Sequence, residues 1–317
     1  MSRRRGLRSR GTQERIDFDN SENLSVFGSS LNTLSEKDKA EINAGVQYIL
    51  SEIGFEHLPK FLECFIDNKK IIKKNNRFCF GLGLIDQCLQ SFNNKVLLHQ
   101  QNRENYLDLS KGNVYFGTGG AAPLILDYEK KIYRPSLGKD LLNAARVVDR
   151  LDNLSFFSRP LVLTDIADPH LMDIYTAVIS LSATNKHVMT SVANSNTVKP
   201  LAEVCYLIAG GEDAFRRSPF LSLNINFIIP PLRLDVEACE VMRESVKYGI
   251  PVMANVFGQR GASSPVSIVG SVCQTVAEAL SGLLICWLLD PDSKVICGPR
   301  AMVTDLRTVS YTHLTLP

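Results

Sequence analysis

Apolar and polar residues follow one repeating order through the second half of the chain: a short apolar run, a loop, then an amphipathic segment. The apolar runs begin near residues 154, 187, 220, 250 and 294. In the amphipathic segments apolar residues recur at every third or fourth position, as Val236, Cys239, Met242 and Val246 do, which gives a helix one apolar face. Strands that alternate with such helices form a parallel sheet covered by helices. The pattern predicts an α/β fold over residues 136–308.

Residues with known capping preferences mark the ends of these helices. Asp168 and Pro169 stand in the N-cap and first-turn arrangement, which predicts a helix from there to about Ala183. Gly210 and Gly249 are expected to stop the helices that begin near residues 198 and 235. Residues 266–289 predict one long core helix, because their most apolar run is about half of the roughly 20 residues that span a bilayer.

The spacing of the strand starts bears on the architecture. An open doubly wound sheet can be complete with about five strands, whereas a (β/α)8 barrel needs about 250 residues, or about 31 for each unit. The observed spacing is close to the barrel figure, and we predict a partial TIM barrel of about five βα units. Residues 309–317 read VSYTHLTLP, with neither helical period nor strand continuity. We expect them to be a foreign, adapter-like tail on a C-terminally truncated chain.

The first 135 residues have a different pattern. Residues 1–34 are polar, start with a basic cluster and lack periodicity, which predicts a disordered leader. Residues 35–135 predict an N-terminal α+β extension, with a helix capped by Ser35 and stopped at Gly54. Two further helices are expected at 57–69 and 81–92, followed by strands and tight turns.

Composition narrows the class of protein. The 317 residues are 45% hydrophobic and 21% charged, with a formal net charge of +2, so no global basic field favours nucleic acid. The eight cysteines form no C-x-x-C pair and most lie in apolar stretches. We expect a reduced, cytoplasmic protein that binds neither nucleic acid nor a membrane. No H-E-x-x-H, G-x-S-x-G or Cys/His zinc pattern occurs, and no metal site is predicted.

The loop after the fourth apolar run, GQRGASSP, is open to three interpretations. Its glycines and the following helix start supply part of a phosphate cradle, although neither the Walker pattern nor G-x-G-x-x-G is present. A tight turn in which Ser263 or Ser264 caps the next helix is the plain structural alternative. A ligand role is the third, because parallel α/β proteins build their sites at the carboxyl ends of strands.

Four motifs in order carry a family resemblance. They are VYFGTGGAAPLILD (114–127), AGGEDAFRRSPFLSLNINFIIPPLR (209–233), YGIPVMANVFGQRGASSPVSIVGSV (248–272) and ICGPRAMVTDLRT (296–308). Together they resemble the trimethylamine and quaternary-amine:corrinoid methyltransferase family, over about residues 40–308. The loop departs from the family's usual lead into Gly-Ala-Thr-Ala/Ser-Pro, and Cys297 stands where tyrosine is common.

The resemblance implies a TIM-barrel enzyme with an α+β extension. Such an enzyme moves a methyl group from a methylated amine, such as glycine betaine or trimethylamine, to the Co(I) of a separate corrinoid protein, so no cofactor is bound tightly by the chain itself. Family members are considerably longer, and catalytic residues are expected on strands beyond this chain's end. A homo-oligomer is a further possibility. Rival hypotheses are another parallel α/β enzyme with an anion site at residues 258–265, and an inactive fragment.

Because cobalt is the nucleophile, the protein's task is to orient the substrate, and a methylated cation suits aromatic faces and carboxylates. His170 and His187 have no metal-ligand partner at useful spacing and are expected to be structural. Each candidate for substrate binding also has a structural alternative: a tight turn, a helix cap, satisfaction of loop backbone, or an ion pair of Arg233 with a neighbouring helix. The candidates are Tyr115, Phe116, Gly117, Gly119, Arg233, Asn255, Gln259, Gly261, Ser263 and Ser264.

Overall fold

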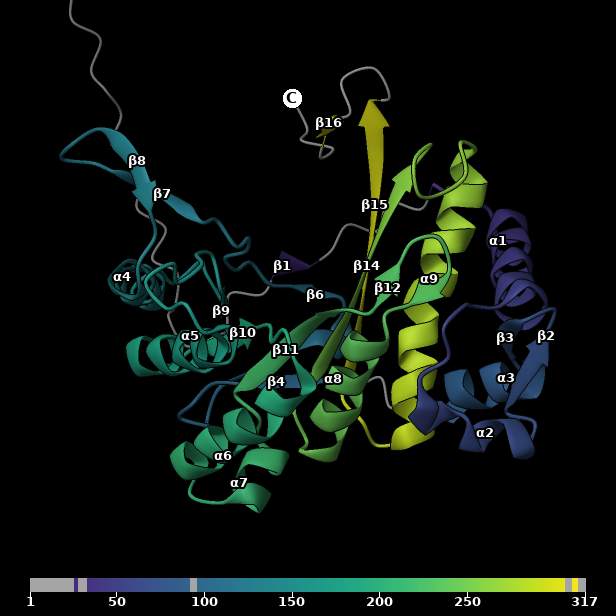
Figure 1. The fold of residues 1–317 in the computed structure, drawn as a ribbon, viewed down its shortest axis with the longest axis horizontal. Helices are drawn as coiled ribbons and strands as arrows, with labels where there is room; N and C mark the ends of the chain where they lie inside the picture. Colours follow the sequence, from purple (N-terminus) through teal and green to yellow (C-terminus); the bar gives the residue numbers. More distant parts are fainter. Residues whose placement is uncertain (1–25, 28–32, 92–95, 306–309, 313–317) are drawn as a thin grey trace, which may run out of the picture.

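A computed structural model describes residues 26–27, 33–91, 96–305 and 310–312 (Figure 1). Most of the expected leader and tail lie outside these residues. Within them, two short strands fall in the leader and the tail, where β1 pairs with β6 and β16 pairs with β15, both antiparallel. The strands of the main sheet are β9 (Phe156–Ser158), β10 (His187–Thr190), β11 (Leu221–Asn226), β14 (Val252–Arg260), β15 (Val295–Asp305) and β16 (Ser310–Thr312).

The main sheet has the strand order β16-β15-β14-β11-β10-β9, in which β9 to β15 are parallel. All five predicted apolar runs contain one of these strands, so the mixed α/β fold with a parallel sheet is confirmed. The lengths differ from the prediction. The run at 154–163 is a strand only over Phe156–Ser158, because Pro160 follows and cannot donate to a ladder. In contrast, β14 continues to Arg260, paired throughout with β15.

The connecting helices begin and end close to the predicted residues. Asp168 caps the first of them by accepting from the N–H groups of His170 and Leu171, and Gly210 ends the second with a left-handed φ of 79°. The prediction that Ser263 or Ser264 caps the long helix is wrong, because Ser267 does so. The helices are α4 (Gly138–Asp149), α5 (Pro169–Ala183), α6 (Val198–Ala209), α7 (Glu212–Arg217), α8 (Val236–Lys247) and α9 (Ile268–Leu289), with a 3-10 turn at Ser195–Thr197.

Helix α9 is long and apolar enough to cross a membrane, with a mean hydropathy of 1.7 over its most apolar window. However, 78% of that window is buried inside the protein. It packs along β14 and β15 and against α1 and α8. The prediction of a core helix is confirmed.

The N-terminal part packs against α9 (Figure 1). Ser35 forms the predicted cap of its first helix, which continues as a π-helical turn (Ile49–Ile53) that ends at Gly54, with φ 69°. Its helices are α1 (Glu36–Tyr48) and α2 (Cys64–Asp67), preceded by a 3-10 turn at Lys60–Leu62, and α3 (Leu82–Ser91). Its strands are β1 (Val26–Phe27), β2 (Ile71–Lys74), β3 (Arg77–Phe80), β4 (Leu97–His99), β5 (Tyr106–Asp108), β6 (Asn113–Val114), β7 (Leu124–Asp127) and β8 (Ile132–Pro135).

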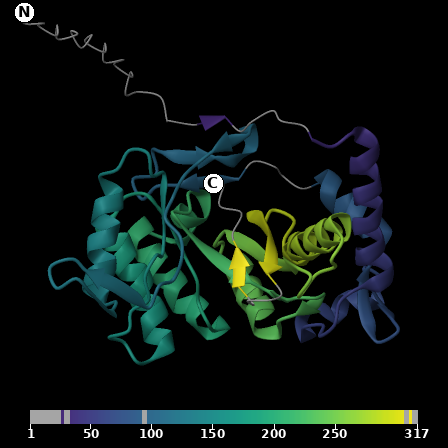
Figure 2. The same cartoon turned by 90° about the horizontal axis from the view of Figure 1, so that it is seen from above.

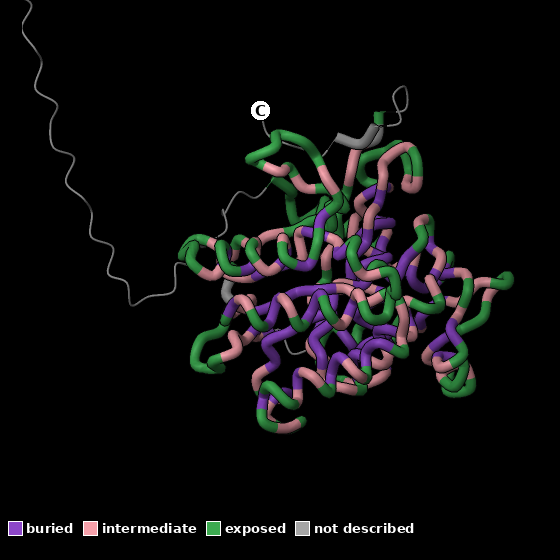
Figure 3. Tube along the Cα trace, turned by 60° about the vertical axis from the view of Figure 1, so that its left-hand side comes forward, coloured by how far each residue is buried: buried purple, intermediate pink, exposed green. Residues whose placement is uncertain are grey.

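The two faces of the main sheet have different chemistry. Residues that share a row across paired parallel strands lie on the same face. One face carries fully buried apolar residues such as Val188, Leu223 and Ala254, and it packs on the helices. The sheet curls around the other face (Figure 2), which we call the concave face and which mixes polar residues such as His187 and Asn255 with apolar ones such as Met189. Figure 3 shows the buried residues following the sheet and the inner sides of the helices.

The β4–β5 hairpin covers part of the concave face. Val96, Leu98 and Leu107 form a small buried cluster against Phe156 of β9 and Ile296 of β15. Fully buried His187 joins the hairpin to the sheet: its Nδ1 donates to the carbonyl of His99 at 2.9 Å, and Ser222 Oγ donates to its Nε2 at 2.9 Å. Burial lowers the pKa of His187 to about 4. His187 is therefore a neutral structural residue, as the sequence predicts.

Residues 117–122 lie along the outer edge of β9. They make parallel bridges from Gly117 to Phe156 and from Ala122 to Leu161. The N–H of Ala122 donates to the carbonyl of Pro160, and the N–H of Val162 donates to the carbonyl of Ala122. This segment covers the β9 edge of the sheet, on the other side of the sheet from β15.

Helix α9 packs closely on the sheet at Gly282. A Cβ added there would lie 2.7 Å from the Phe227 ring and 2.8 Å from Ala254 Cβ. We expect Gly282→Ala to lower the free energy of unfolding by about 1–3 kcal/mol in urea titrations, because overpacking displaces buried neighbours. The control is Gly83→Ala in α3, where no atom lies within 4 Å and the change should stay below about 1 kcal/mol. Equal losses in both variants would contradict the packing argument.

Candidate functional site

Asn255 is the fourth of the nine residues of β14 and lies on the concave face, 4% exposed. Its Nδ2 donates to Oδ1 of Asn224 on β11 at 3.1 Å. Its Oδ1 is buried without a hydrogen-bond partner among the described residues and lies directly over the backbone of Gly298, its register partner on β15. A Cβ at Gly298 would collide with this oxygen. The glycine therefore makes room for the amide. In register the row is Asn226, Asn255 and Gly298, and Asn224 lies two residues before Asn226 on the same face of β11.

A hollow of about 270 Å³ opens beside this row, between the ends of β10 and β11 and the start of α8. The side chains of Asn224 and Asn226 line it together with the carboxylates of Asp235 and Glu237. Asp235 caps α8 through the N–H of Ala238, and Glu237 accepts from the N–H of Ser195 at 2.7 Å. Amide oxygens and two carboxylates make this a suitable environment for a small organic cation.

The loop after β14 is closed on itself. The N–H groups of Ala262, Ser263 and Ser264 all donate to the carbonyl of Gln259, and the N–H of Gly261 donates to Ser264. Ser263 Oγ accepts from the N–H of Gln259. Gly261 takes a left-handed φ of 86°, which a tight turn requires. No N–H of residues 261–264 remains to hold a phosphate, and this geometry argues against an anion cradle.

Two buried side chains of α9, Gln274 and Glu278, connect the loop after β14 to the chain after β11. Gln274 Nε2 donates to the carbonyl of Ser263 at 2.9 Å and to Glu278 Oε1 at 3.0 Å. The same carboxylate oxygen accepts from the N–H of Leu232 at 2.8 Å, whereas Oε2 has no partner among the described residues. Glu278 is 0% exposed, and burial raises its pKa to about 7. The pair connects the chain after β11 with the loop after β14.

The substrate-binding candidates at residues 115–119 have different surroundings from the residues on β11, β14 and α9. Tyr115 packs in the cluster below β9 and β15, and its hydroxyl accepts from the N–H of Asp108 at 3.1 Å. Phe116 is 55% exposed, and its carbonyl accepts from the N–H of Ser155. Gly117 lies so close to the Phe156 ring that any Cβ would collide with it, whereas Gly119 has open space around it. Tyr115 and Gly117 thus have clear packing roles.

Arg233 lies on a two-stranded hairpin of β12 (Ile228–Ile229) and β13 (Arg233–Leu234). It lines an open hollow of about 430 Å³ with Arg77 and Glu56. The carboxylate of Glu56 pairs with Arg77 and not with Arg233. The expected ion pair between Arg233 and a neighbouring helix is absent from the described residues, because β13 directs its side chain toward this hollow.

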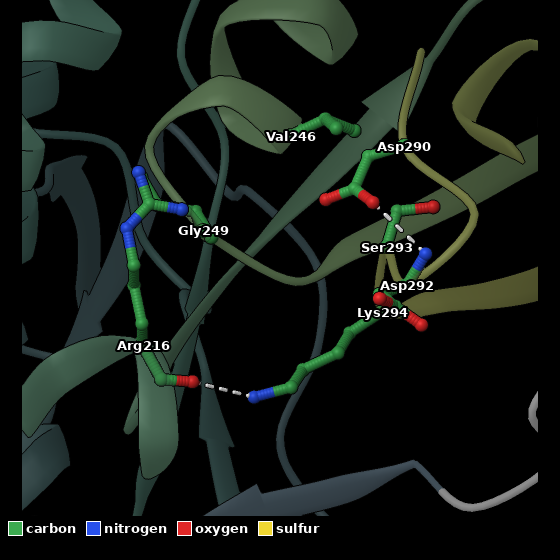
Figure 4. Close-up of a pocket in the computed structure, with 8 residues that line it drawn as sticks. Arg216, Val246, Gly249, Asp290, Asp292, Ser293 and Lys294 are labelled. Carbon is green, nitrogen blue, oxygen red and sulfur yellow. Dashed lines mark hydrogen bonds between the residues drawn. The ribbon is translucent and has the colours of Figure 1, made fainter. Parts of the chain in front are cut away.

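Another pocket, of about 170 Å³, lies at the opposite end of the sheet, where β14 and β15 begin (Figure 4). Its charged groups are already engaged. Lys294 Nζ donates to the carbonyl of Arg216 at 2.8 Å, and Asp290 Oδ1 accepts from the N–H of Asp292 at 2.9 Å. Within the described residues no cluster of three or more histidine, cysteine or acidic side chains could hold a metal ion.

The structure brings together Gln259, Gly261, Ser263 and Ser264 at the carboxyl end of β14, whereas Asn255 lies further back on that strand, beside Asn224. Sequence reasoning missed their partners Asn224 and Gln274, and the lining residue Asn226. Asn224 and Asn226 alternate with apolar residues in the run SLNINF. Polar residues at every second position of a buried strand are the signal that could have found them.

Comparison with known proteins assigns this chain to a family. The family model described as trimethylamine methyltransferase (MTTB) matches residues 2–313. The chain belongs to this family. The family resemblance drawn from the four motifs is confirmed.

Named relatives include both trimethylamine and betaine enzymes. A trimethylamine methyltransferase MttB of Desulfitobacterium hafniense (strain DSM 10664 / DCB-2) is 28% identical over 72% of this chain and 45% of its own length. One from Methanosarcina barkeri (strain Fusaro / DSM 804) is 26% identical over 88% of this chain and 58% of its own. A glycine betaine methyltransferase of Desulfitobacterium hafniense (strain Y51) is also 26% identical, over 88% and 58%. The chain spans about half the length of the curated relatives it matches.

Proposed function

We propose that this protein transfers a methyl group from a methylated amine to the Co(I) of a corrinoid carried by a partner protein. The observation that carries the proposal is the family match over residues 2–313, joined to the amide side chains of Asn226, at the carboxyl end of β11, and of Asn255 beside it on β14. That end of a parallel α/β sheet is where enzymes of this architecture build their sites. Trimethylamine and glycine betaine are the substrates that the relatives' names suggest.

The sheet is proposed to be part of a (β/α)8 barrel. Residues 117–122, parallel to β9, would then take the place of the first strand and α4 that of the first helix. The strands β9, β10, β11, β14 and β15 would follow in order around the barrel. This placement would start the barrel inside the segment that the sequence assigns to the N-terminal extension.

The transfer breaks the methyl C–N bond and forms a C–Co bond. The electron pair of the C–N bond stays on nitrogen, and the pair that forms the new bond comes from cobalt, which is oxidised from Co(I) to Co(III). A quaternary ammonium leaves as a neutral amine and needs no general acid, whereas a tertiary amine must be activated first. On the described part of the concave face His187 is held neutral by its two hydrogen bonds, and Asn224 and Asn255 are amides. These residues suit a quaternary amine better.

Each group has a definite task in this proposal. The carboxylates of Asp235 and Glu237 attract the cation to the hollow beside β11. Asn255, held by Asn224 and seated over Gly298, keeps the middle of β14 in one position. Gln274 and Glu278 fix the loop after β14 from behind. The residues orient the donor, because the nucleophile is supplied by the acceptor.

The concave face also fits the acceptor. Corrinoids carry peripheral amide groups, and Asn224 and Asn226, which line the hollow beside β11, offer complementary hydrogen-bonding groups. These residues would face the corrinoid, which supplies the cobalt nucleophile when bound.

The test is an anaerobic assay with free cob(I)alamin as acceptor and glycine betaine or trimethylamine as donor. The reaction is monitored through the loss of cob(I)alamin absorbance. We expect amine-dependent conversion to methylcobalamin. Gly298→Ala should lower kcat by about 10- to 100-fold, because it displaces Asn255, whereas Gly83→Ala should not change it. An absence of conversion with any methylated amine would contradict the proposed function.

A further inference from the structure

Leu232, in the turn between β12 and β13, has a backbone conformation that leucine rarely adopts. Its φ is 51°, in the left-handed region, and the residue is only 8% exposed. A bulky residue stays in this region only where the surrounding contacts fix the backbone. The turn follows β11 and precedes α8, at the carboxyl end of the sheet. The contacts that fix Leu232 therefore also shape that end of the sheet.

The backbone of Leu232 is held from two parts of the protein. Its N–H donates to Glu278 Oε1 on α9 at 2.8 Å. Its carbonyl accepts from the N–H of Glu56 at 3.0 Å and from Arg77 Nη2 at 3.2 Å, and both donors belong to the N-terminal part. A buried backbone group that loses its partner costs free energy. These bonds therefore clamp Leu232 between the N-terminal part and α9.

Arg77, on β3, joins several groups of the N-terminal part to this turn. Its Nη2 also donates to the carbonyl of Gly54 at 2.9 Å, and its Nε donates to the carbonyl of Ile53 at 3.0 Å. Its Nη1 donates to the carboxylate of Glu56, whose own carbonyl accepts from the N–H of Leu234 at 3.0 Å. A guanidinium presents five donors in fixed directions, and neither lysine nor methionine can replace this set.

Gln274 carries the contacts onward from Glu278 to the loop after β14. Its Nε2 donates to Glu278 Oε1 at 3.0 Å and to the carbonyl of Ser263 at 2.9 Å. Glu278 is 0% and Gln274 6% exposed, so water does not compete for these bonds. A continuous set of hydrogen bonds thus runs from Arg77 through Leu232, Glu278 and Gln274 to Ser263. We call it the Arg77–Ser263 path.

We infer that Arg77 is a positioning residue for the proposed methyl transfer, because it fixes the loop after β14, residues 259–264, through this path. The inference rests on the proposed function, in which that loop borders the site of the methyl donor. Among the described residues Arg77 makes no hydrogen bond to the loop itself, so it acts through the groups between them. A small displacement of positioning groups slows the chemical step, and kcat should therefore respond more than KM.

The test compares Arg77→Met with Lys74→Met. Lys74 is the register partner of Arg77 on the same hairpin, and it donates to the carbonyl of Ser51 and to Glu52. The control therefore removes a cation and its bonds without removing a bond to Leu232. We expect Arg77→Met to raise the hydrogen-exchange rates of the amides at 259–264 about tenfold. It should lower kcat with free cob(I)alamin about tenfold and keep KM for the amine within about threefold. Lys74→Met should change neither.

A second variant, Gln274→Leu, breaks the path at its other end. The double variant R77M/Q274L should exchange at 259–264 no faster than the faster single variant, because one broken link already frees the loop. Multiplied effects of the two substitutions would show that Arg77 and Gln274 act independently, and would overturn the inference. Arg77→Lys keeps the charge without the fork and should lie between wild type and Arg77→Met. It gives the same comparison if Arg77→Met does not fold.

The remaining outcomes separate the inference from the proposed function. If Arg77→Met exchanges faster at 228–236 but like wild type at 259–264, the effect ends at the β12–β13 hairpin and the inference is wrong. Faster exchange at 259–264 with an unchanged kcat would also overturn the positioning role. A wild-type enzyme that methylates cob(I)alamin from no methylated amine would overturn the proposed function, and the role of Arg77 in the reaction with it, whatever the exchange rates show.

Discussion

Glu278→Gln is expected to remove a loss of stability that wild-type protein undergoes as pH rises from 4.5 to 7. Burial raises the pKa of Glu278 to about 7, above the ordinary value of 4.5. Between these two pH values the folded state keeps a proton that the unfolded state has lost, so the contribution of Glu278 to stability is complete below pH 4.5 and is lost as pH rises toward 7. The glutamine variant has no such loss. Its free energy of unfolding relative to wild type should rise by about 3 kcal/mol from pH 4.5 to 7.

The measurement is a series of urea titrations of both proteins across this pH range. Glutamine keeps the Oε1 contacts to the N–H of Leu232 and to Gln274. The loops therefore stay tied, and Glu278→Leu serves as the control that loses these contacts and is destabilised at every pH. A difference between Glu278→Gln and wild type that does not vary with pH would show that Glu278 is ionised in the folded protein.

His187→Asn is expected to act in the opposite direction. The pKa of His187 falls to about 4 from the ordinary 6.5. Its neutral ring contributes stability that is complete above pH 6.5 and is lost as pH falls toward 4, a change of about 3 kcal/mol. In wild-type protein this trend opposes that of Glu278. Asparagine removes it, so the stability of the variant should fall more steeply with rising pH than that of wild type.

The variant also loses ring packing and the contact to Ser222, so we expect it to be less stable by about 2–3 kcal/mol at pH 7. Thermal melts at pH 5, 6 and 7 separate this constant loss from the pH-dependent part. The stability of the double variant E278Q/H187N should show neither of these two pH-dependent contributions. Parallel curves for His187→Asn and wild type would contradict a depressed pKa in the folded state.

The order of the main sheet could be predicted because local signals were strong. Apolar runs that begin 30 to 44 residues apart, and Asp168 before Pro169, give the strands and the start of α5 without any tertiary information. The end of β14 could not be predicted, because Gly258 to Arg260 are held as strand by pairing with β15. The β4–β5 hairpin, fixed partly by the contact from His99 to His187, depends on a partner 88 positions away.

The candidate site was predictable only on one strand. Gln259 and the loop serines lie together because they are close in sequence, whereas Asn255 pairs with Asn224 of β11 and Gln274 reaches Ser263 from α9. Arg233 was expected to find a helix partner, but the β12–β13 hairpin turns it away from the helices. The interpretation of GQRGASSP as an anion loop loses support once its N–H groups are seen to bond within the loop.

The most direct test of the central claim follows the methyl group itself. The protein is incubated anaerobically with cob(I)alamin and glycine betaine or trimethylamine labelled with ¹³C in the methyl groups, and the products are identified by ¹³C NMR. We expect label on cobalt in methylcobalamin and an equimolar amount of amine that has lost one methyl group. Label that stays entirely on the amine, with cob(I)alamin unchanged, would contradict the account.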